Sequence, residues 1–216
     1  MTLLYLAVNY RKTMDKKIII NIGRQFGGGG LGVASALGRK LGIPVYDREL
    51  IRKAAQDSGF SAELFEQSDE KRRIFSLTAV FASIYSSPDE NYVSDKGLFK
   101  IQCSTIRKIA EQGSAIIVGR CSDYVLRDMD CILNVFLTSP LQERVKRICE
   151  RHSISEEDAE TLILRKDKAR EEYYNYYTFG NWGVASTYDL CIDSSKLGIE
   201  GTADFIIDFA KRSGLL

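Results

Sequence analysis

A glycine-rich run between a strand and a helix limits the fold of this chain more than any other feature. Residues 23–32 read Gly-Arg-Gln-Phe-Gly-Gly-Gly-Gly-Leu-Gly. A β-branched apolar stretch at 18–22 comes directly before the run, and a helical pattern comes directly after it. In this order, glycines let an anion approach inward-pointing main-chain N–H groups, and the helix N-terminus adds positive potential. The pattern predicts a phosphate-binding loop, and the alternative is a glycine turn without a ligand.

The loop lacks the lysine and hydroxyl side chains that such loops ordinarily carry. The common pattern ends in Lys and then Ser or Thr, for the phosphates and for magnesium, whereas glycines stand in those places here. We therefore expect the phosphates to bind the main chain of six consecutive residues: Gly27, Gly28, Gly29, Gly30, Leu31 and Gly32. The spacing of Gly27, Gly29 and Gly32 also fits a dinucleotide-binding loop, provided that Asp47 is the acidic residue that closes the second strand.

Short apolar segments alternate with helical patterns along most of the chain. Strands are predicted at five places: 17–22, 43–46, 115–118, 131–137 and 188–192. Helices are predicted at six places: 31–41, 50–56, 98–112, 141–151, 156–174 and 199–210. Helical patches without strands set residues 58–97 apart as an insertion. Continuous apolar strands interleaved with helices are typical of an α/β fold with a five-stranded parallel sheet and right-handed crossovers.

Length and charge restrict the domain count and the partners. A chain of 216 residues is long enough for one well-cored domain, which we place at 17–216 after a weakly structured extension at 1–16. The formal net charge is +1, so no overall field favours nucleic acid or a membrane surface. The apolar stretch at 3–8 is too short to span a bilayer and lacks the flanks of a signal peptide. Met14 is an alternative start of the chain.

The five cysteines indicate a reduced, cytoplasmic compartment. They are odd in number, widely separated and never arranged as C-x-x-C, so neither a zinc site nor a disulfide framework is expected. We interpret them as small core residues, with Cys131 and Cys191 inside strands. The single histidine, His152, lies in a turn between helices and is assigned no chemistry.

Several segments together carry a resemblance to a known family. They occupy five ranges: 23–30, 41–50, 116–120, 166–170 with the tyrosines that follow, and 188–192. In these segments the chain resembles the cytidylate-kinase-like branch of the P-loop nucleoside monophosphate kinases. The resemblance implies a P-loop three-layer sandwich with a monophosphate-binding insertion at 58–97 and a lid at 152–187. It also implies transfer of the ATP γ-phosphoryl group to CMP or a similar small nucleotide, with ATP and Mg2+ as cofactors, and it is compatible with a homodimer.

Departures from the family pattern keep two other hypotheses open. Gly30 stands where the loop lysine belongs, Gly32 where the magnesium-binding threonine belongs, and Val118 where an acidic residue is common. Because phosphoryl transfer depends on positioning and on neutralising phosphate charge, another cation must take the place of the lysine. If none does, the chain is a nucleotide-binding protein that has lost catalysis. A kinase for a non-nucleotide acceptor is the third hypothesis.

Candidate catalytic cations lie in the loop and in a late helix. Arg24 sits inside the loop, where a guanidinium can clamp two phosphate oxygens, or else it pairs with a surface carboxylate. Lys168 and Arg170 lie two residues apart on a helix, so they diverge by about 200° and cannot both face one phosphate without rotation of the lid. Arg170 shares a face with Lys166, and the alternative for all these helix cations is a solvated surface.

Candidate acceptor-binding residues follow two of the predicted strands. Arg120 comes after the third strand at its carboxyl end, where ligands bind in open α/β sheets, and the resemblance assigns it the acceptor phosphate. Asp123 either orients Arg120 or caps a helix. Asp47 and Arg48 follow the second strand, and Asp47 fits either a metal-bound water or a helix N-cap. No side chain is predicted to bind a metal ion directly.

An aromatic run occupies residues 173–182, together with two glycines at 180 and 183. Its members are Tyr173, Tyr174, Tyr176, Tyr177, Phe179 and Trp182. The run predicts either a lid that covers a base or ribose, or a surface that packs a long helix onto the body or onto a partner subunit.

Overall fold

Five parallel strands form one sheet, which confirms the predicted fold. The computed structural model describes residues 17–57 and 96–216, so the extension at 1–16 and the insertion up to residue 95 lie outside the described residues. The strands are β1 (Ile19–Arg24), β2 (Val45–Tyr46), β3 (Ala115–Val118), β4 (Ile132–Thr138) and β5 (Leu190–Asp193). They are ordered β2-β3-β1-β4-β5, so β1 lies at the centre, between β3 and β4.

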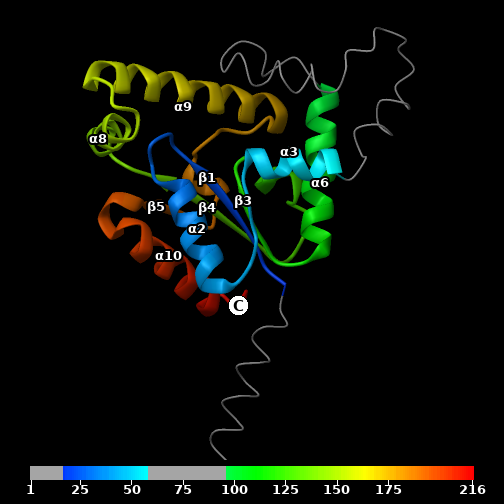
Figure 1. Ribbon diagram of the computed structural model, residues 1–216. Coiled ribbons are helices and arrows are strands. Elements are labelled where there is room, and N and C mark those ends of the chain that lie inside the picture. The colour runs from blue at the N-terminus through cyan, green and yellow to red at the C-terminus, as the bar shows by residue number, and fades with distance from the viewer. Residues whose placement is uncertain (1–16, 58–95) are drawn as a thin grey trace, which may run out of the picture.

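Side chains of β1 alternate between two apolar cores, one on each face of the sheet. Ile20 and Ile22 contribute to the core beneath α2 (Gly30–Leu41) and α10 (Ser194–Arg212). Ile19 contributes to the opposite core, beneath α3 (Arg48–Asp57), α6 (Lys96–Gln112) and α7 (Ser122–Val125). Figure 1 shows α2 and α10 on one side of the sheet and α3 and α6 on the other, so the central strand is covered on both faces.

Two further helices lie away from the faces of the sheet. The helices α8 (Leu141–His152) and α9 (Glu156–Thr178) pack against each other through a small cluster that includes Val145 and Ile163. Phe26, from the loop after β1, packs against the same cluster. In Figure 1, α9 lies beyond the end of the sheet on the side where the β1–α2 loop emerges. The α8–α9 pair therefore contacts the loop that the sequence predicts to bind phosphate.

The structure corrects several boundaries in the predicted elements. The predicted helix at 156–174 continues to Thr178, so four of the six aromatic residues in the run are helical. The predicted helix at 199–210 belongs to a longer α10 that begins at Ser194 and bends at Gly198, whose φ of 65° interrupts the helix. Two short elements were not predicted, α7 and the 3₁₀ helix Ala185–Thr187, because neither is long enough to show a periodic pattern.

The prediction that the cysteines are core residues is wrong for Cys191. Its side chain is exposed, whereas the thiol of Cys121 is buried. Cys191 lies on β5, which pairs with β4 and forms the edge of the sheet. Ile192 faces the core on one side of this strand, so its neighbour points to the opposite side. None of the described helices is long and apolar enough to cross a membrane.

Candidate active site

The β1–α2 loop is held in place through its carbonyl groups. Three consecutive carbonyls accept hydrogen bonds from side chains outside the loop: that of Phe26 from Arg144 at 3.3 Å, that of Gly27 from Arg147, and that of Gly28 from Ser194 at 2.8 Å. With these oxygens engaged by α8 and α10, the loop cannot easily turn them towards a bound anion. The loop is therefore fixed with three carbonyl oxygens pointing towards α8 and α10, away from the place where an anion would bind.

The helix that follows begins without a side-chain cap. Gly29 is its N-cap residue, with a φ of 76°, and no side chain accepts a hydrogen bond from the first turn. The first-turn amides of Gly30, Leu31 and Gly32 have no carbonyl four residues earlier within the helix. A helix N-terminus with such amides favours a negatively charged group. This end of the loop can therefore bind phosphate through its main chain.

Arg24 crosses the loop at the point where a lysine is usually found. A Cβ atom on Gly30 would lie 2.7 Å from Cγ of Arg24, and a Cβ atom on Gly119 would overlap its Nη1. The Arg24 side chain therefore passes over Gly30 and ends against the carboxyl end of β3. A larger residue at either glycine would displace it.

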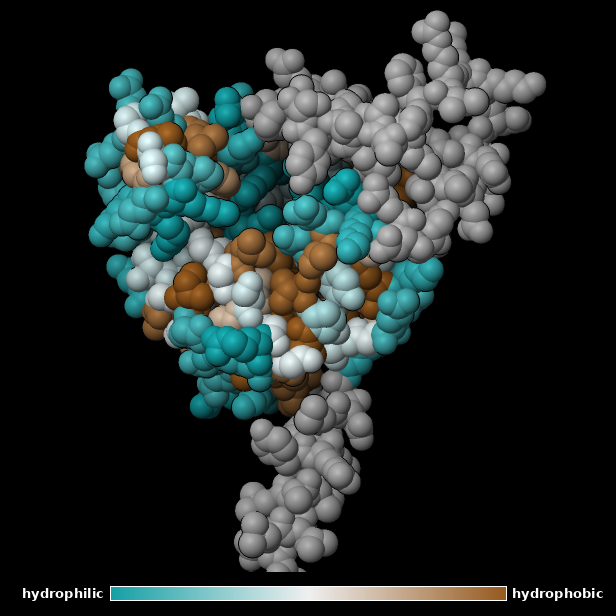
Figure 2. Space-filling view, in the orientation of Figure 1, coloured by the Kyte–Doolittle hydropathy of each residue, from teal (hydrophilic) through white to brown (hydrophobic). Residues whose placement is uncertain are grey.

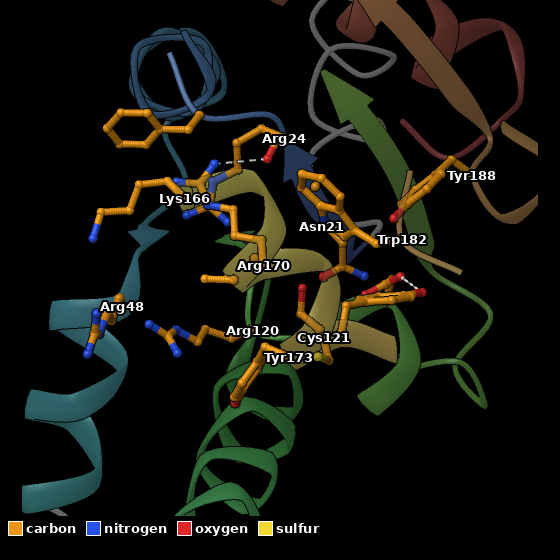
Figure 3. A pocket seen from close by; sticks show the side chains of 17 residues that line it. Asn21, Arg24, Arg48, Arg120, Cys121, Lys166, Arg170, Tyr173, Trp182 and Tyr188 are labelled. Carbon is orange, nitrogen blue, oxygen red and sulfur yellow. Dashed lines mark hydrogen bonds between the residues drawn. The ribbon is translucent and has the colours of Figure 1, made fainter. Parts of the chain in front are cut away.

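A cavity of about 300 Å3 opens beside Arg24. Five cationic side chains from four parts of the chain line it: Arg24, Arg48, Arg120, Lys166 and Arg170. Asp123 is the one carboxylate among the described lining residues, so the cavity has a marked excess of positive charge. Figure 3 shows the cations on one side of the view and the Trp182 and Tyr188 side chains on the other. In Figure 2 the surface around the recess beneath α9 is largely hydrophilic.

Arg120 is held at the end of β3 by its backbone. Its φ is 63°, and that of Cys121 is 55°, two successive left-handed residues that are uncommon outside glycine. The Arg120 carbonyl accepts a hydrogen bond from Nε2 of Gln102 at 3.1 Å, and the same nitrogen lies 3.0 Å from the Tyr173 hydroxyl. The Arg120 guanidinium lies 5.6 Å from the centre of the Tyr173 ring, within the range of a cation–π contact.

Asp123 lies in the same cavity with a phenol as partner. The Tyr174 hydroxyl donates a hydrogen bond to Oδ2 of Asp123 over 2.7 Å. Burial raises the pKa of Asp123, and the hydrogen bond from Tyr174 opposes that shift. Burial and the nearby carboxylate raise the pKa of Tyr174, and the same two causes raise that of Tyr188. The phenols therefore remain protonated near neutral pH and act as hydrogen-bond donors.

The helix α9, which lies in the predicted lid region, contacts the loop at two points. Arg170 donates from Nη1 to the Arg24 carbonyl at 3.0 Å, and its guanidinium lies 5.3 Å from the centre of the Phe26 ring. Asp167 accepts the Phe26 amide at 2.6 Å through one oxygen and pairs with Arg144 at 2.5 Å through the other. Both members of this ion pair are largely buried. The structure therefore describes α9 in contact with the loop.

Eight of the candidate residues are not among those that line the cavity: Lys168, Asp47 and the six loop residues 27–32. The Lys168 side chain is 75% exposed and lies 3.9 Å from Glu172, one turn further along α9. Asp47 accepts the amides of Glu49 and Leu50, both at 3.0 Å, and thereby caps α3. Asp47 thus takes the capping alternative, while its neighbour Arg48 lines the cavity. His152 is exposed at the end of α8.

Some residues of the aromatic run line the cavity, and others pack against a neighbouring helix. Tyr173, Tyr174 and Trp182 line the cavity. Tyr177 stacks on Phe99 of α6 with ring centres 3.9 Å apart, which is a packing contact. The helical spacing of the run therefore directs some rings to the site and others to a neighbouring helix.

Three side chains at the site were not recognised from the sequence. Asn21 lines the cavity from the middle of β1, and the buried pair of Arg144 with Asp167 joins α8 to α9. A polar residue within a β-branched strand was a visible signal for Asn21. The ion pair joins residues 23 positions apart on two surface-patterned helices, so no local pattern marked it.

The fold and the loop together define the class of protein, which is that of the P-loop kinases. The structure is similar to a crystal structure of shikimate kinase from Acinetobacter baumannii in complex with shikimate, with a TM-score of 0.52 and 12% identity. That match covers 95% of this chain and 99% of the other, and at this identity it shows the fold alone.

Within that class, the chain belongs to the cytidylate kinase-like family, whose sequence profile matches residues 19–196. It is 25% identical over 187 residues to a cytidylate kinase of Pyrococcus horikoshii, a match that covers 86% of this chain and 84% of that protein. It is 30% identical over 128 residues to a cytidylate kinase of Sulfolobus acidocaldarius, covering 59% and 68%. An uncharacterized protein from Eubacterium ventriosum has a similar crystal structure, with a TM-score of 0.68, 29% identity, and coverage of 90% and 99%.

Proposed function

We propose that the protein is an ATP-dependent phosphotransferase that transfers the γ-phosphoryl group of ATP to CMP or a similar nucleoside monophosphate. The proposal rests on the family, whose curated relatives are called cytidylate kinases, and on the excess of cations in one cavity. The triphosphate of ATP and the phosphate of the acceptor must approach each other in such a reaction, and several cations are needed to offset their repulsion. The absence of the loop lysine makes Arg24 the decisive residue.

In this proposal the two substrates approach from opposite ends of the cation cluster. The loop at residues 27–32 holds the donor phosphates, through the uncapped amides of Gly30, Leu31 and Gly32. Arg120 and Arg48 hold the acceptor phosphate, and Asp123 contributes a carboxylate to the acceptor side. Arg170 lies near the junction, because its guanidinium contacts the main chain of Arg24.

The position of the Arg24 side chain over Gly30 carries the proposal. Gly30 leaves open the space that the Arg24 side chain occupies. A lysine at position 30 and an arginine at position 24 would therefore compete for the same space. A guanidinium is permanently charged and can donate two parallel hydrogen bonds to phosphate oxygens. Arg24 therefore supplies positive charge next to the loop, as the lysine does in other phosphate-binding loops.

Magnesium enters this proposal as part of the MgATP substrate. No group of three or more His, Cys, Asp or Glu side chains in residues 17–57 and 96–216 could hold a metal ion. Mg2+ often keeps several waters and binds through substrate phosphates with few protein ligands. The donor set of this site, with one carboxylate at the cavity, fits that mode and not a dedicated protein site.

The chemical step needs positioning more than covalent chemistry by the protein. An oxygen of the acceptor phosphate attacks the γ-phosphorus, the bond from that phosphorus to the bridging oxygen breaks, and ADP leaves. Arg24 and Arg170 would stabilise the negative charge on the transferring group, while Arg120 holds the nucleophile in line. Because α9 contacts the loop directly, this helix would also exclude water from the transferred group.

Substitution of Arg24 tests the proposal. We expect Arg24→Ala to lower kcat for ATP-dependent phosphorylation of CMP by about 10²- to 10³-fold, which is typical of removing one donor that stabilises transition-state charge. Arg39→Ala is the matched control, since Arg39 is exposed in the last turn of α2 and pairs with Glu200. Wild-type protein that binds ATP and CMP but transfers nothing to any monophosphate would instead support the nucleotide-binding alternative.

A double substitution distinguishes replacement of the lysine from a purely structural role. The Arg24→Ala change empties the space above Gly30, so Arg24→Ala with Gly30→Lys would restore the ordinary loop lysine. We expect kcat of this double variant to be at least about tenfold higher than that of Arg24→Ala, because the charge returns to the loop. Gly30→Lys alone should be poorly active, since the new side chain collides with Arg24. No recovery in a folded double variant would contradict the proposed replacement.

A further inference from the structure

A buried amide in the central strand has an unused hydrogen-bond acceptor. Asn21 lies in the middle of β1, opposite Ile117 of β3 and Asn134 of β4. Only 2% of the residue is exposed to solvent. The flanking residues of this strand, Ile20 and Ile22, are fully buried isoleucines. A polar residue at such a position costs stability unless its polar atoms are paired.

One half of the Asn21 amide is paired and the other is not. Nδ2 donates a hydrogen bond to Oδ1 of Asn134 over 2.9 Å. Oδ1 has no hydrogen-bond partner among the described residues. Buried polar atoms without a partner are rare in native proteins, and each costs about 1–3 kcal/mol. An unpaired atom of this kind, in a residue that lines a cavity, indicates a partner that binds there once the side chain exposes the oxygen.

Two hydrogen-bond donors at or near the cavity are already paired with other acceptors. The Tyr174 hydroxyl donates to Asp123, and Nε2 of Gln102 is bound to the Arg120 carbonyl and the Tyr173 hydroxyl. Asn21 itself lines the cavity together with Tyr173 and Tyr174. Figure 3 shows its amide between the labelled arginines and the Tyr188 side chain. The cavity wall therefore combines cations with a residue that has unfilled acceptor capacity.

We infer that Oδ1 of Asn21 is a recognition point for a hydrogen-bond donor on the acceptor substrate, either a hydroxyl or an amino group. The inference rests on the proposed function, in which this cavity holds the acceptor. A molecule that carries both an anionic group and a hydroxyl or amino group matches this cavity wall. In a nucleoside monophosphate such a donor is a ribose hydroxyl or the exocyclic amino group of the base.

Direct binding measurements can test this inference without any turnover. We would titrate the protein with CMP, UMP, 2′-deoxy-CMP and 3′-deoxy-CMP by calorimetry. We expect wild-type protein to bind CMP about tenfold more tightly than the one analogue that lacks the recognised donor, because a lost hydrogen bond leaves Asn21 unpaired. The UMP arm reports on the base amino group, and the two deoxy arms report on the ribose hydroxyls.

Variants of Asn21 should remove that discrimination selectively. Asn21→Leu keeps the number and branching of the side-chain heavy atoms without a hydrogen-bond acceptor, and Asn21→Val is a second, smaller variant that suits a β-strand. In a variant with an intact melting transition, we expect the tenfold preference to fall below about twofold. Asn134→Leu is the matched control, because it removes the partner of Nδ2 and leaves Oδ1 in place. The preference should persist in that control.

Two outcomes would overturn the inference, and both are separable from failure of the proposed function. If folded Asn21 variants weaken all four ligands equally, or none, then Asn21 has a structural role or binds a buried water. If wild-type protein shows no preference among the four, its acceptor atom does not recognise the substrate. Failure of ATP-dependent transfer alongside selective binding would contradict the phosphotransferase but leave the recognition intact. No binding of any of the four would overturn both.

Discussion

The two basic faces of α9 have similar charge but different surroundings. On one face, five residues at helical spacing line the cavity: Lys166, Ala169, Arg170, Tyr173 and Tyr174. On the other face, Lys168 and Arg165 are exposed, and Lys168 pairs with Glu172 at 3.9 Å. Arg170 instead contacts a main-chain carbonyl of a fixed loop. Cations of the same helix therefore differ in function according to their partners. Arg170 binds a fixed main-chain carbonyl, whereas Lys168 pairs with a flexible side chain at the surface.

Of the substitutions that test the difference between the two faces, removal of Asp167 should have the largest effect, a loss in the free energy of unfolding. Asp167 binds the Phe26 amide and the largely buried Arg144, so it joins the inner face of α9 to the loop. Asp167→Ala leaves the Arg144 charge buried and unpaired, which typically costs about 3–5 kcal/mol. We expect a loss of this size in the free energy of unfolding, measured by urea denaturation at neutral pH.

A conservative variant of the same residue separates charge from hydrogen bonding. Asp167→Asn keeps an oxygen that can accept the Phe26 amide but removes the negative charge. It should fall between the wild type and Asp167→Ala. A loss below about 1 kcal/mol for Asp167→Ala, as for exposed ion pairs, would contradict the buried anchor and make the two faces of α9 equivalent.

Arg170 and Lys168 should differ strongly in their effect on activity. We expect Arg170→Ala to lower kcat/KM for phosphoryl transfer by about 100-fold, since this cation lies in the cavity and contacts the loop. Lys168→Ala should lower it by less than about threefold, because its charge is exposed to solvent. Steady-state kinetics with MgATP and CMP would measure both. Equal losses for the two variants would mean that α9 rotates during the reaction and presents both faces.

The smallest effect is expected at the start of α9, before the helix reaches the cavity. Ser155 is the N-cap, and its Oγ accepts the Asp158 amide at 3.1 Å. Ser155→Ala should destabilise the protein by about 1 kcal/mol and lower the melting temperature by about 2–4 °C. Ser155→Asp keeps a capping oxygen and serves as the control in a calorimetric melting scan. Matching losses in both variants would show that the cap contributes nothing.

Local patterns in the sequence were enough to predict the sheet and the loop. The β-branched run before the glycines and the four later apolar segments correspond to β1 through β5. The angular argument for Lys168 and Arg170 also holds, since helix geometry alone separates them, and the structure directs Arg170 inward. Such features depend on residues a few positions apart, so periodicity and turn chemistry reveal them.

Other features of the site depend on residues far apart in the chain. Asp47 fitted two roles equally until the structure placed its carboxylate on the amides of Glu49 and Leu50. The pairing of Asp167 with Arg144 and with the Phe26 amide joins three segments that share no sequence pattern. Cys191 appeared to be a core residue because an isolated strand pattern does not show which strand forms the edge of the sheet.

The amino-acid sequence by itself determined the strand–loop–helix order, the parallel α/β class and the loss of the loop lysine, because these follow from residue identity and local spacing. Only the tertiary structure decided that Arg24 passes over Gly30 towards Gly119, and that Asn21 carries an unpaired oxygen at the cavity. The physical reason is that a side chain's partner depends on which strands and helices meet around it. That choice is made by packing across the whole sheet and not by its neighbours in the chain.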